Sequence, residues 1–500
     1  MTVDPARTSP DKPSAASGGP TTTEDVSGAH QLESLGYQQD LKRALSVFGA
    51  IALTVSDITP TASLLIIGPV AIATAGTGAF WAYVVAGLLA LCVALCMGEL
   101  GSMFPVAGGL YSIVTRVLGR PIGFLALLDY VGQAVFLPAS IALGIGTYLT
   151  VLFPSVNTNL AALIVMIAVT LIAVFTVSAS ARLTTVFLAL ELLVVATLAV
   201  AGFLHMHQSL GILIKPVTAT ASGVTSAIGL GIVFTAVATA LFSYNGYDSA
   251  INFSEETEGA AAHVGQAVVR AAIIGVVFEV IPLTGVLLAA PRLGPLITGS
   301  SPFTYVITTS LGGTINTIVT LGAIVAVFNA CLAITLQFAR ILYSSGRDRA
   351  WPGPVSAAFA RVHPRFGSPW VATLVVGGLA SVLTFFSSLV AVVTFTSVLI
   401  IILYALIAIS ALVSRTRQPG ATRPYRMPLW PLPPIVALVG VVIAITQQKG
   451  SDLLICAAIF VAGLVYYAAY LRSRRATHWA VSPVGPVGAA APSASPRTAL

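Results

Sequence analysis

Charged residues are scarce in this sequence. Aspartate, glutamate, lysine and arginine make up 8% of the 500 residues, whereas 57% are hydrophobic, and the mean hydropathy is +0.95. This balance excludes a soluble protein and indicates a polytopic protein embedded in a lipid bilayer. The net charge of +7 does not indicate binding to nucleic acid, because the cations lie in short loops between apolar runs.

Cysteine is also scarce, and motifs of catalysis are lacking. All four cysteines lie inside apolar runs, and none has the histidine or acidic neighbours of a metal site. We find no nucleophile–base arrangement and no phosphate-binding loop. The sequence therefore predicts no enzyme, no metal and no cofactor.

The two ends of the chain lack apolar runs. Residues 1–40 are rich in Ser, Thr, Pro and Gly without the apolar core of a cleaved signal peptide, and residues 476–500 are rich in Pro, Ala and Ser. Both are expected to be disordered cytoplasmic tails.

Between the tails the hydropathy predicts an all-α protein of twelve transmembrane helices. The expected spans are 45–71, 76–98, 121–150, 158–178, 184–206, 226–251, 268–290, 315–342, 370–388, 390–413, 430–447 and 453–471. Lys and Arg gather in alternate loops, and few cations lie in the others. Cytoplasmic loops carry such an excess, so both termini are expected in the cytoplasm, with the chain in the plasma (inner) membrane.

The first span is interrupted at its centre by Ser56-Asp57-Ile58-Thr59-Pro60-Thr61-Ala62-Ser63. Pro60 has no N–H, and its ring clashes with the preceding turn, so the helix should break or kink there. Irregular backbone at membrane depth persists only where it is buried or lines a cavity, and a charge there costs about 2.5–3.5 kcal/mol or more. We interpret the stretch as half of a substrate site; the alternative is a proline kink with its hydroxyls bonded to carbonyls.

The sixth span has a second interruption, Phe242-Ser243-Tyr244-Asn245-Gly246-Tyr247-Asp248. Two interrupted spans at corresponding places of two halves are typical of a transporter built from inverted repeats. The interruptions lie five spans apart, which predicts a 5+5 inverted repeat with discontinuous spans 1 and 6. The repeats would cover residues 41–206 and 207–413, followed by two appended helices at 414–475.

Three motifs resemble the amino acid–polyamine–organocation (APC) superfamily of secondary transporters. They are Gly98-Glu99-Leu100 with Pro105 and Gly108-Gly109-Leu110-Tyr111, Phe242 to Asp248 followed by Asn252-Phe253-Ser254-Glu255-Glu256-Thr257, and Arg340 to Asp348 followed by Val362-His363-Pro364-Arg365 and Pro369. The resemblance covers spans 1 to 9. The sequence departs from it where the family's span 1 break is Gly-rich and this chain has Thr61-Ala62-Ser63.

The resemblance implies a substrate site at the two interruptions. Amides of the second half of span 1 would bind a carboxylate, and carbonyls of span 6 would accept from an ammonium group. The expected substrate-binding residues are Asp57, Thr59, Thr61, Ala62, Ser63, Phe242, Ser243, Asn245 and Gly246. Phe242 lies where relatives place a gating aromatic residue.

Three acidic residues are candidates for coupling to an ion. Asp57 could pair with a substrate amine, couple a proton or sodium ion, or cap a half-helix. Glu191 lies mid-span, where ionisable residues mark proton relays, and its alternative is a neutral carboxyl bonded to a neighbouring helix. Asp248 resembles an acidic position linked to pH response, or is a helix cap. Asp129 and Glu279 also lie within spans, without a motif.

The first hypothesis from the sequence is thus a proton-coupled permease that moves amino acids by alternating access. The alternative is a transporter of carboxylate-free amines such as ethanolamine, choline-like compounds or polyamines. A channel or sensor belongs to a different class and is disfavoured, because no folded soluble appendage is visible. Glu255, Glu256 and Glu258 lie at the cytoplasmic end of span 6. They are expected to be either solvated or paired with cytoplasmic arginines, and to belong to a gate or to the structure rather than to the substrate site.

Overall fold

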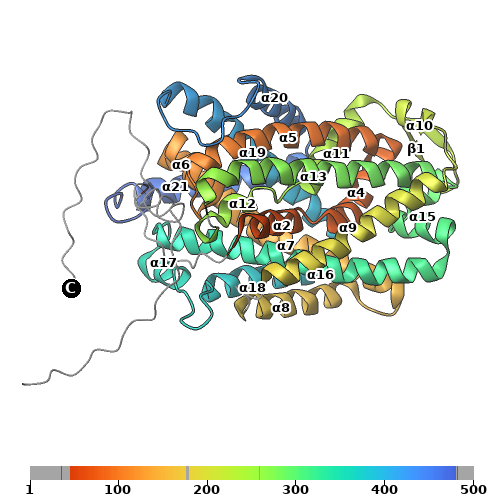
Figure 1. Cartoon of the computed structure of the whole chain (residues 1–500), viewed down its shortest axis with the longest axis horizontal. Helices are drawn as coiled ribbons and strands as arrows, with labels where there is room; N and C mark the ends of the chain where they lie inside the picture. Colours follow the sequence, from red (N-terminus) through yellow and green to blue (C-terminus); the bar gives the residue numbers. More distant parts are fainter. Residues whose placement is uncertain (1–34, 36–44, 176–179, 258, 480, 482–500) are drawn as a thin grey trace, which may run out of the picture.

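The computed structural model describes residues 35, 45–175, 180–257, 259–479 and 481. Most of the two expected tails, 1–40 and 476–500, lies outside these residues. The described chain is a bundle of helices (Figure 1). The helices and helical turns are α2 (Val47–Ile58), α3 (Pro60–Ala62), η1 (Ser63–Ile67), α4 (Gly68–Ala75), η2 (Gly76–Gly78), α5 (Ala79–Met103), α6 (Gly109–Leu118), α7 (Arg120–Leu152), α8 (Thr158–Phe175), α9 (Ser180–Leu204), α10 (Gly211–Ile214), α11 (Leu230–Ser243), α12 (Ser249–Asn252), η3 (Ser254–Glu256), α13 (Ala260–Ala289), α14 (Leu293–Thr298), α15 (Pro302–Leu311), α16 (Gly313–Arg347), α17 (Gly353–Phe359), α18 (Trp370–Phe386), α19 (Leu389–Arg417), α20 (Leu432–Thr446), α21 (Gly450–Tyr466) and η4 (Tyr467–Leu471).

The helices are long and apolar enough for a multi-pass membrane protein. Eight helical stretches of the described chain could cross a membrane, and the first, Val47–Met103, contains both expected spans 1 and 2. Shorter apolar helices, α11, α18 and α20, stand where spans 6, 9 and 11 are expected. The full count of twelve stays a prediction, because these three are shorter than a membrane-spanning helix ordinarily is.

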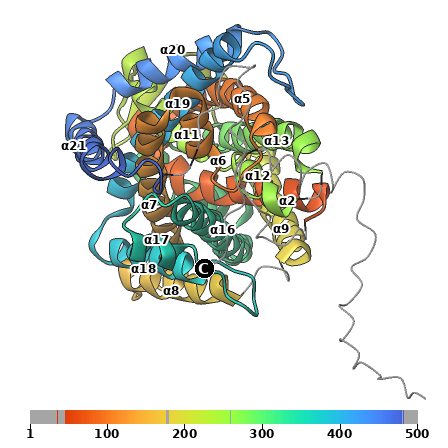
Figure 2. The same ribbon diagram turned by 90° about the vertical axis from the view of Figure 1, so that its left-hand side faces the viewer.

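The two interruptions lie inside the bundle, because residues 58–68 and 242–257 are all buried, whereas α2 itself lies at the edge of the bundle in Figure 2. Packing joins elements five expected spans apart: α5 packs on α13, α7 on α16, α8 on α18, and α2 on α12. Two repeats related by a two-fold axis would pack equivalent helices in this way, and the repeat itself stays a prediction. The only strands in the described chain form a hairpin between α10 and α11, in which β1 (Val217–Ala219) pairs antiparallel with β2 (Thr225–Ala227).

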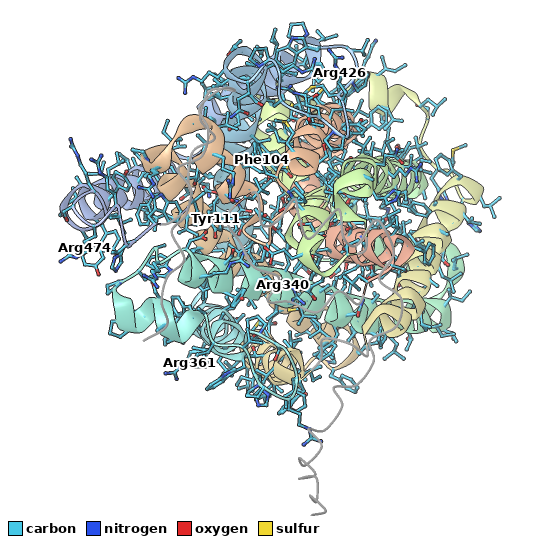
Figure 3. The ribbon with its side chains drawn as sticks, turned by 60° about the vertical axis from the view of Figure 1, so that its left-hand side comes forward. Phe104, Tyr111, Arg340, Arg361, Arg426 and Arg474 are labelled. Carbon is cyan, nitrogen blue, oxygen red and sulfur yellow. The ribbon has the colours of Figure 1, made fainter. Side chains whose placement is uncertain are left out.

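Arginines gather at the end of the bundle that carries α12, α17 and the C-terminal part of α19, which we call the arginine-rich end (Figure 3). Arg340 pairs with Glu256, and Arg347 pairs with Glu255 at 2.8 Å, so the expected pairing of these two acids is confirmed. Glu258 lies outside the described residues. Leu45, just before α2, donates its N–H to the Glu256 carbonyl at 3.0 Å. The start of span 1 and the end of span 6 are therefore tied together at this end.

Glu99 joins three segments at the same end. Its carboxylate accepts from Arg415 Nε at 2.8 Å, from Arg423 Nε at 3.1 Å and from the Met427 amide at 2.8 Å. The E-L motif thus has a structural role that the sequence did not reveal, because its partners lie more than 300 positions away in the chain.

The packed chain continues past residue 475, where the sequence predicts the start of a tail. Trp479 is buried, stacks on Tyr111 with ring centroids 5.8 Å apart, and donates its Nε1–H to the Arg120 carbonyl at 3.0 Å. Arg120 Nη2 donates back to the Trp479 carbonyl at 2.7 Å. A buried aromatic side chain with a satisfied N–H offsets the entropy lost by ordering these few residues.

Candidate functional site

The interruption predicted in span 1 is present and centres on Thr59. Helix α2 ends at Ile58, and Thr59 adopts a left-handed conformation with φ 54° and ψ 63°. A residue before proline is disfavoured in the right-handed helical region, so the chain turns there and restarts with Pro60 as the first residue of α3. The helix then widens into a π-helical turn at Ser63–Ile67. Such wide turns occur mostly as short insertions and often at functional sites.

The interruption predicted in span 6 is present as well. Helix α11 ends at Ser243, residues 244–248 form turns, and α12 begins at Ser249. Gly246 has φ 120°, a conformation that a residue with a Cβ rarely adopts. A glycine at this position is therefore what allows the helix to open and restart.

The two interruptions touch each other. A Cβ added to Gly246 would lie 2.6 Å from the carbonyl carbon and oxygen of Asp57, so the two backbones meet where no side chain fits. Ser63 Oγ lies 2.7 Å from the Ser243 carbonyl oxygen and 2.9 Å from the Ile58 carbonyl oxygen, and its one proton can be donated to either. Tyr83 OH lies 2.7 Å from Ser243 Oγ. Hydroxyl groups thus satisfy carbonyls that the broken helices leave without a partner.

All nine expected substrate-binding residues are buried where the two spans meet. The amide of Ser63 donates to the Thr59 carbonyl at 2.8 Å, so binding a carboxylate through this amide requires that bond to open. The side-chain oxygen of Asn245 accepts from Tyr404 OH in α19 at 3.0 Å. Thr61 Oγ1 donates to the Glu191 carbonyl at 2.9 Å. Helix α19 therefore contacts the interruption of span 6, and helix α9 contacts the interruption of span 1.

A cavity of about 250 Å³ lies beyond the interruption of span 1, on the side of α4. Leu65, Ile66, Tyr148, Leu389 and Val390 contribute to its mainly apolar lining. Tyr148 OH donates to the Leu65 carbonyl at 2.8 Å, within the π-helical turn. A small solute in this cavity would lie next to the widened turn, on the side away from the arginine-rich end.

Asp57 and Glu191 are buried, and none of their carboxylate oxygens has a hydrogen-bond donor in bonding geometry among the described residues. Ser249, at the start of α12, is a neighbour of Asp57, and Asn329 of α16 is a neighbour of Glu191. Asn329 itself donates to Ser56 Oγ at 2.9 Å. Glu191 therefore belongs to a polar cluster that joins expected spans 1, 5 and 8.

Asp248 belongs to a second polar cluster. Its Oδ2 accepts from Tyr130 OH in α7 and, at 3.2 Å, from Gln337 Nε2 in α16. Asn252 Nδ2 donates to Tyr130 OH at 3.0 Å. Asp248 lies two residues after Gly246, whose backbone meets that of Asp57. The structure thus brings two of the three acidic candidates together and places Glu191 in the other cluster.

Two groups near the interruptions, Glu279 and Tyr130, have no sequence motif. Glu279 of α13 is buried without a hydrogen-bond donor among the described residues, and it lies near Tyr83 and Tyr244. Tyr130 is the donor to Asp248. The sequence could indicate Glu279 as a functional candidate, because it is an ionisable residue in the middle of a span. It gives no such indication for Tyr130, because a tyrosine in an apolar run is common. Asp129 pairs within its own helix, accepting from Gln133 at 2.9 Å.

No group of three His, Cys, Asp or Glu side chains suited to a metal ion occurs in the part of the chain that the structure describes. The site therefore consists of interrupted backbone, hydroxyls, amides and buried carboxyls. These groups suit the reversible binding of a small polar solute and the transfer of a proton.

Several known transporters are similar to this chain over most of its length. The chain is 24% identical to the methylthioribose transporter of Bacillus subtilis (strain 168) over 81% of this chain and 89% of the relative. It is 24% identical to the branched-chain amino acid permease BcaP of the same organism, over 87% and 94% of the two chains. It is 25% identical to the serine/threonine exchanger SteT, also from B. subtilis, over 87% and 98%. Residues 45–486 match the amino acid permease family, and the chain belongs to that family.

Proposed function

We propose that this protein is a secondary active transporter that moves amino acids across the plasma membrane by alternating access, coupled to protons. The observation that carries the proposal is the contact between two interrupted spans at Gly246 and Asp57, with buried carboxyls beside it. Interrupted spans present free backbone groups to a zwitterion, and rocking of one helix group against another opens them to either side. The names of the permease BcaP and the exchanger SteT support an amino acid as the substrate.

The proposal includes an orientation and a division of the chain. Both termini are cytoplasmic, because the arginine-rich end is the positive side of the bundle and holds both Leu45 and Trp479. Residues 41–206 and 207–413 form the two repeats, and 414–475 the appended pair of helices. The acids Asp57, Glu191 and Asp248 carry the coupling, with the nine buried residues of spans 1 and 6 binding the substrate.

The test is uptake by the purified protein in proteoliposomes. We expect saturable uptake of labelled leucine, valine, serine or threonine, faster when unlabelled substrate is inside and concentrative when a proton gradient points inward. Empty liposomes and an inward sodium gradient are the controls. Flux without saturation or counterflow would indicate a channel, and uptake restricted to ethanolamine or other carboxylate-free amines would reject the amino acid as substrate.

A further inference from the structure

A second cavity lies far from the interruptions, at the arginine-rich end. It has a volume of about 460 Å³ and lies between the end of α19 and the start of α20. Figure 3 shows Arg426 at the outer edge of this end. The lining residues are Arg415, Pro419, Ala421, Arg423, Arg426 and Trp430.

The cavity has an excess of positive charge. The segment 414–430 contains four arginines, namely Arg415, Arg417, Arg423 and Arg426, and no acidic residue. Glu99 reaches the cavity wall, but one carboxylate faces both Arg415 and Arg423, and its oxygens already accept from these arginines and from the Met427 amide. Arg426 is exposed and makes no ion pair with any described residue. An anion would therefore be attracted here.

The guanidinium groups are held in place. Arg415 lies over the Trp430 ring, 4.6 Å from its centroid, while its Nε and Nη2 bind Glu99. No hydrogen bond among the described residues uses Arg415 Nη1, so this nitrogen has two N–H groups to donate. Planar guanidinium groups match the oxygens of a phosphate. Because Glu99 and Trp430 already order Arg415, an anion loses little entropy in recruiting it.

An exposed apolar strip begins next to the cavity. Leu432, Ile435, Val439 and Val442 of α20 are exposed by 43% or more of their surface, and Leu429 beside the cavity is 73% exposed. Their spacing of three and four residues places the four α20 side chains on one face of the helix. A free phosphate ion would make no contact with this strip, whereas the acyl chains of a phospholipid would pack against it.

We propose that this cavity binds the phosphate of an anionic phospholipid headgroup, with the acyl chains along the exposed face of α20. Basic pockets between helices at the cytoplasmic side of a membrane bind such headgroups. The bound lipid would clamp the segment 418–430 to α19 and, through Glu99, to α5. This inference rests on the cavity and its arginines and does not depend on the substrate of the transporter.

The test compares the lipid retained by purified full-length protein from nanodiscs of phosphatidylcholine with and without phosphatidylglycerol, by native mass spectrometry. Arg426→Gln is the variant, because Arg426 lines the cavity without holding Glu99. Arg361→Gln, an exposed arginine of the same end outside the cavity, is the matched control. We expect Arg426→Gln to lower retention of phosphatidylglycerol about fivefold, the factor that corresponds to about 1 kcal/mol per basic residue, and Arg361→Gln to leave it unchanged.

Two results would overturn the proposal. Equal retention by the wild type and Arg426→Gln would show that the cavity holds no headgroup. Thermal stabilisation of the lipid-free protein by inorganic phosphate alone, lost in Arg426→Gln and without selective retention of phosphatidylglycerol, would assign the cavity to free phosphate rather than to a lipid.

Discussion

The acidic side chains at the centre of the bundle and those at the arginine-rich end are buried alike, yet their surroundings differ. At the end, Glu99, Glu255 and Glu256 each face arginine at bonding distance. At the centre, Asp57, Glu191 and Glu279 have neither a cation nor a hydrogen-bond donor in bonding geometry among the described residues. A buried carboxylate that is paired with an arginine holds two segments together, and breaking the pair is costly. A buried carboxyl group without such a partner can exchange a proton or bind a ligand.

Glu99→Gln should have the largest effect on stability. It leaves Arg415 and Arg423, both mostly buried, without their counter-charge, and removing one partner of a buried ion pair costs about 3–5 kcal/mol. The measurement is the free energy of unfolding in mixed micelles. Asp452→Asn, which removes an acid without an ion pair among the described residues, is the control and should change little. A Glu99→Gln protein as stable as the control would contradict the structural role of this end.

Gly246→Ala should have the next largest effect and should act at the centre. Its methyl group would lie 2.6 Å from the Asp57 backbone, at a φ that alanine rarely adopts, and such strain costs about 1–3 kcal/mol. Uptake should fall because the two interruptions are forced apart. Gly231→Ala in α11, with open space around the added Cβ, is the matched control and should keep full uptake. Normal transport by Gly246→Ala would mean that the contact is dispensable.

Asp57→Asn should leave stability almost unchanged, within about 1 kcal/mol, because no cation loses its partner. If the carboxylate binds the ammonium group, uptake should fall by about tenfold to a hundredfold, since hydrogen bonds to charged groups contribute about 1.5–3 kcal/mol. Initial rates in proteoliposomes measure the effect. A loss of stability as large as that of Glu99→Gln would remove the distinction between the two regions.

Glu191→Gln should have the smallest effect on stability and a selective effect on coupling. The neutral amide fits where a carboxyl already lacks a donor, but it cannot carry a proton. Accumulation driven by a proton gradient should disappear, while exchange of labelled for unlabelled substrate continues. If the gradient still drives accumulation in this variant, Glu191 does not couple the proton.

Much of the fold and part of the site could be predicted from the sequence. Hydropathy located the helices, and Pro60 and Gly246 marked the two interruptions, because proline and glycine act on the backbone wherever it lies. Asn329 and Gln337 were visible as polar residues within an apolar helix, but that they bond Ser56 and Asp248 depends on how the spans pack. Tyr130 and the partners of Glu99 carried no local signal at all.

The sequence by itself determined that this chain is a helical membrane protein with two interrupted spans, because apolar length and helix-breaking residues act locally. Only the tertiary structure decided which acids have partners: Glu99 meets arginines from distant segments, whereas Asp57 and Glu191 meet no arginine or lysine among the described residues. It also showed that Trp479 is buried and that three arginines line one cavity, next to an exposed apolar strip on α20. The physical reason is that burial and charge pairing depend on contacts between segments far apart in the chain, which no local pattern specifies.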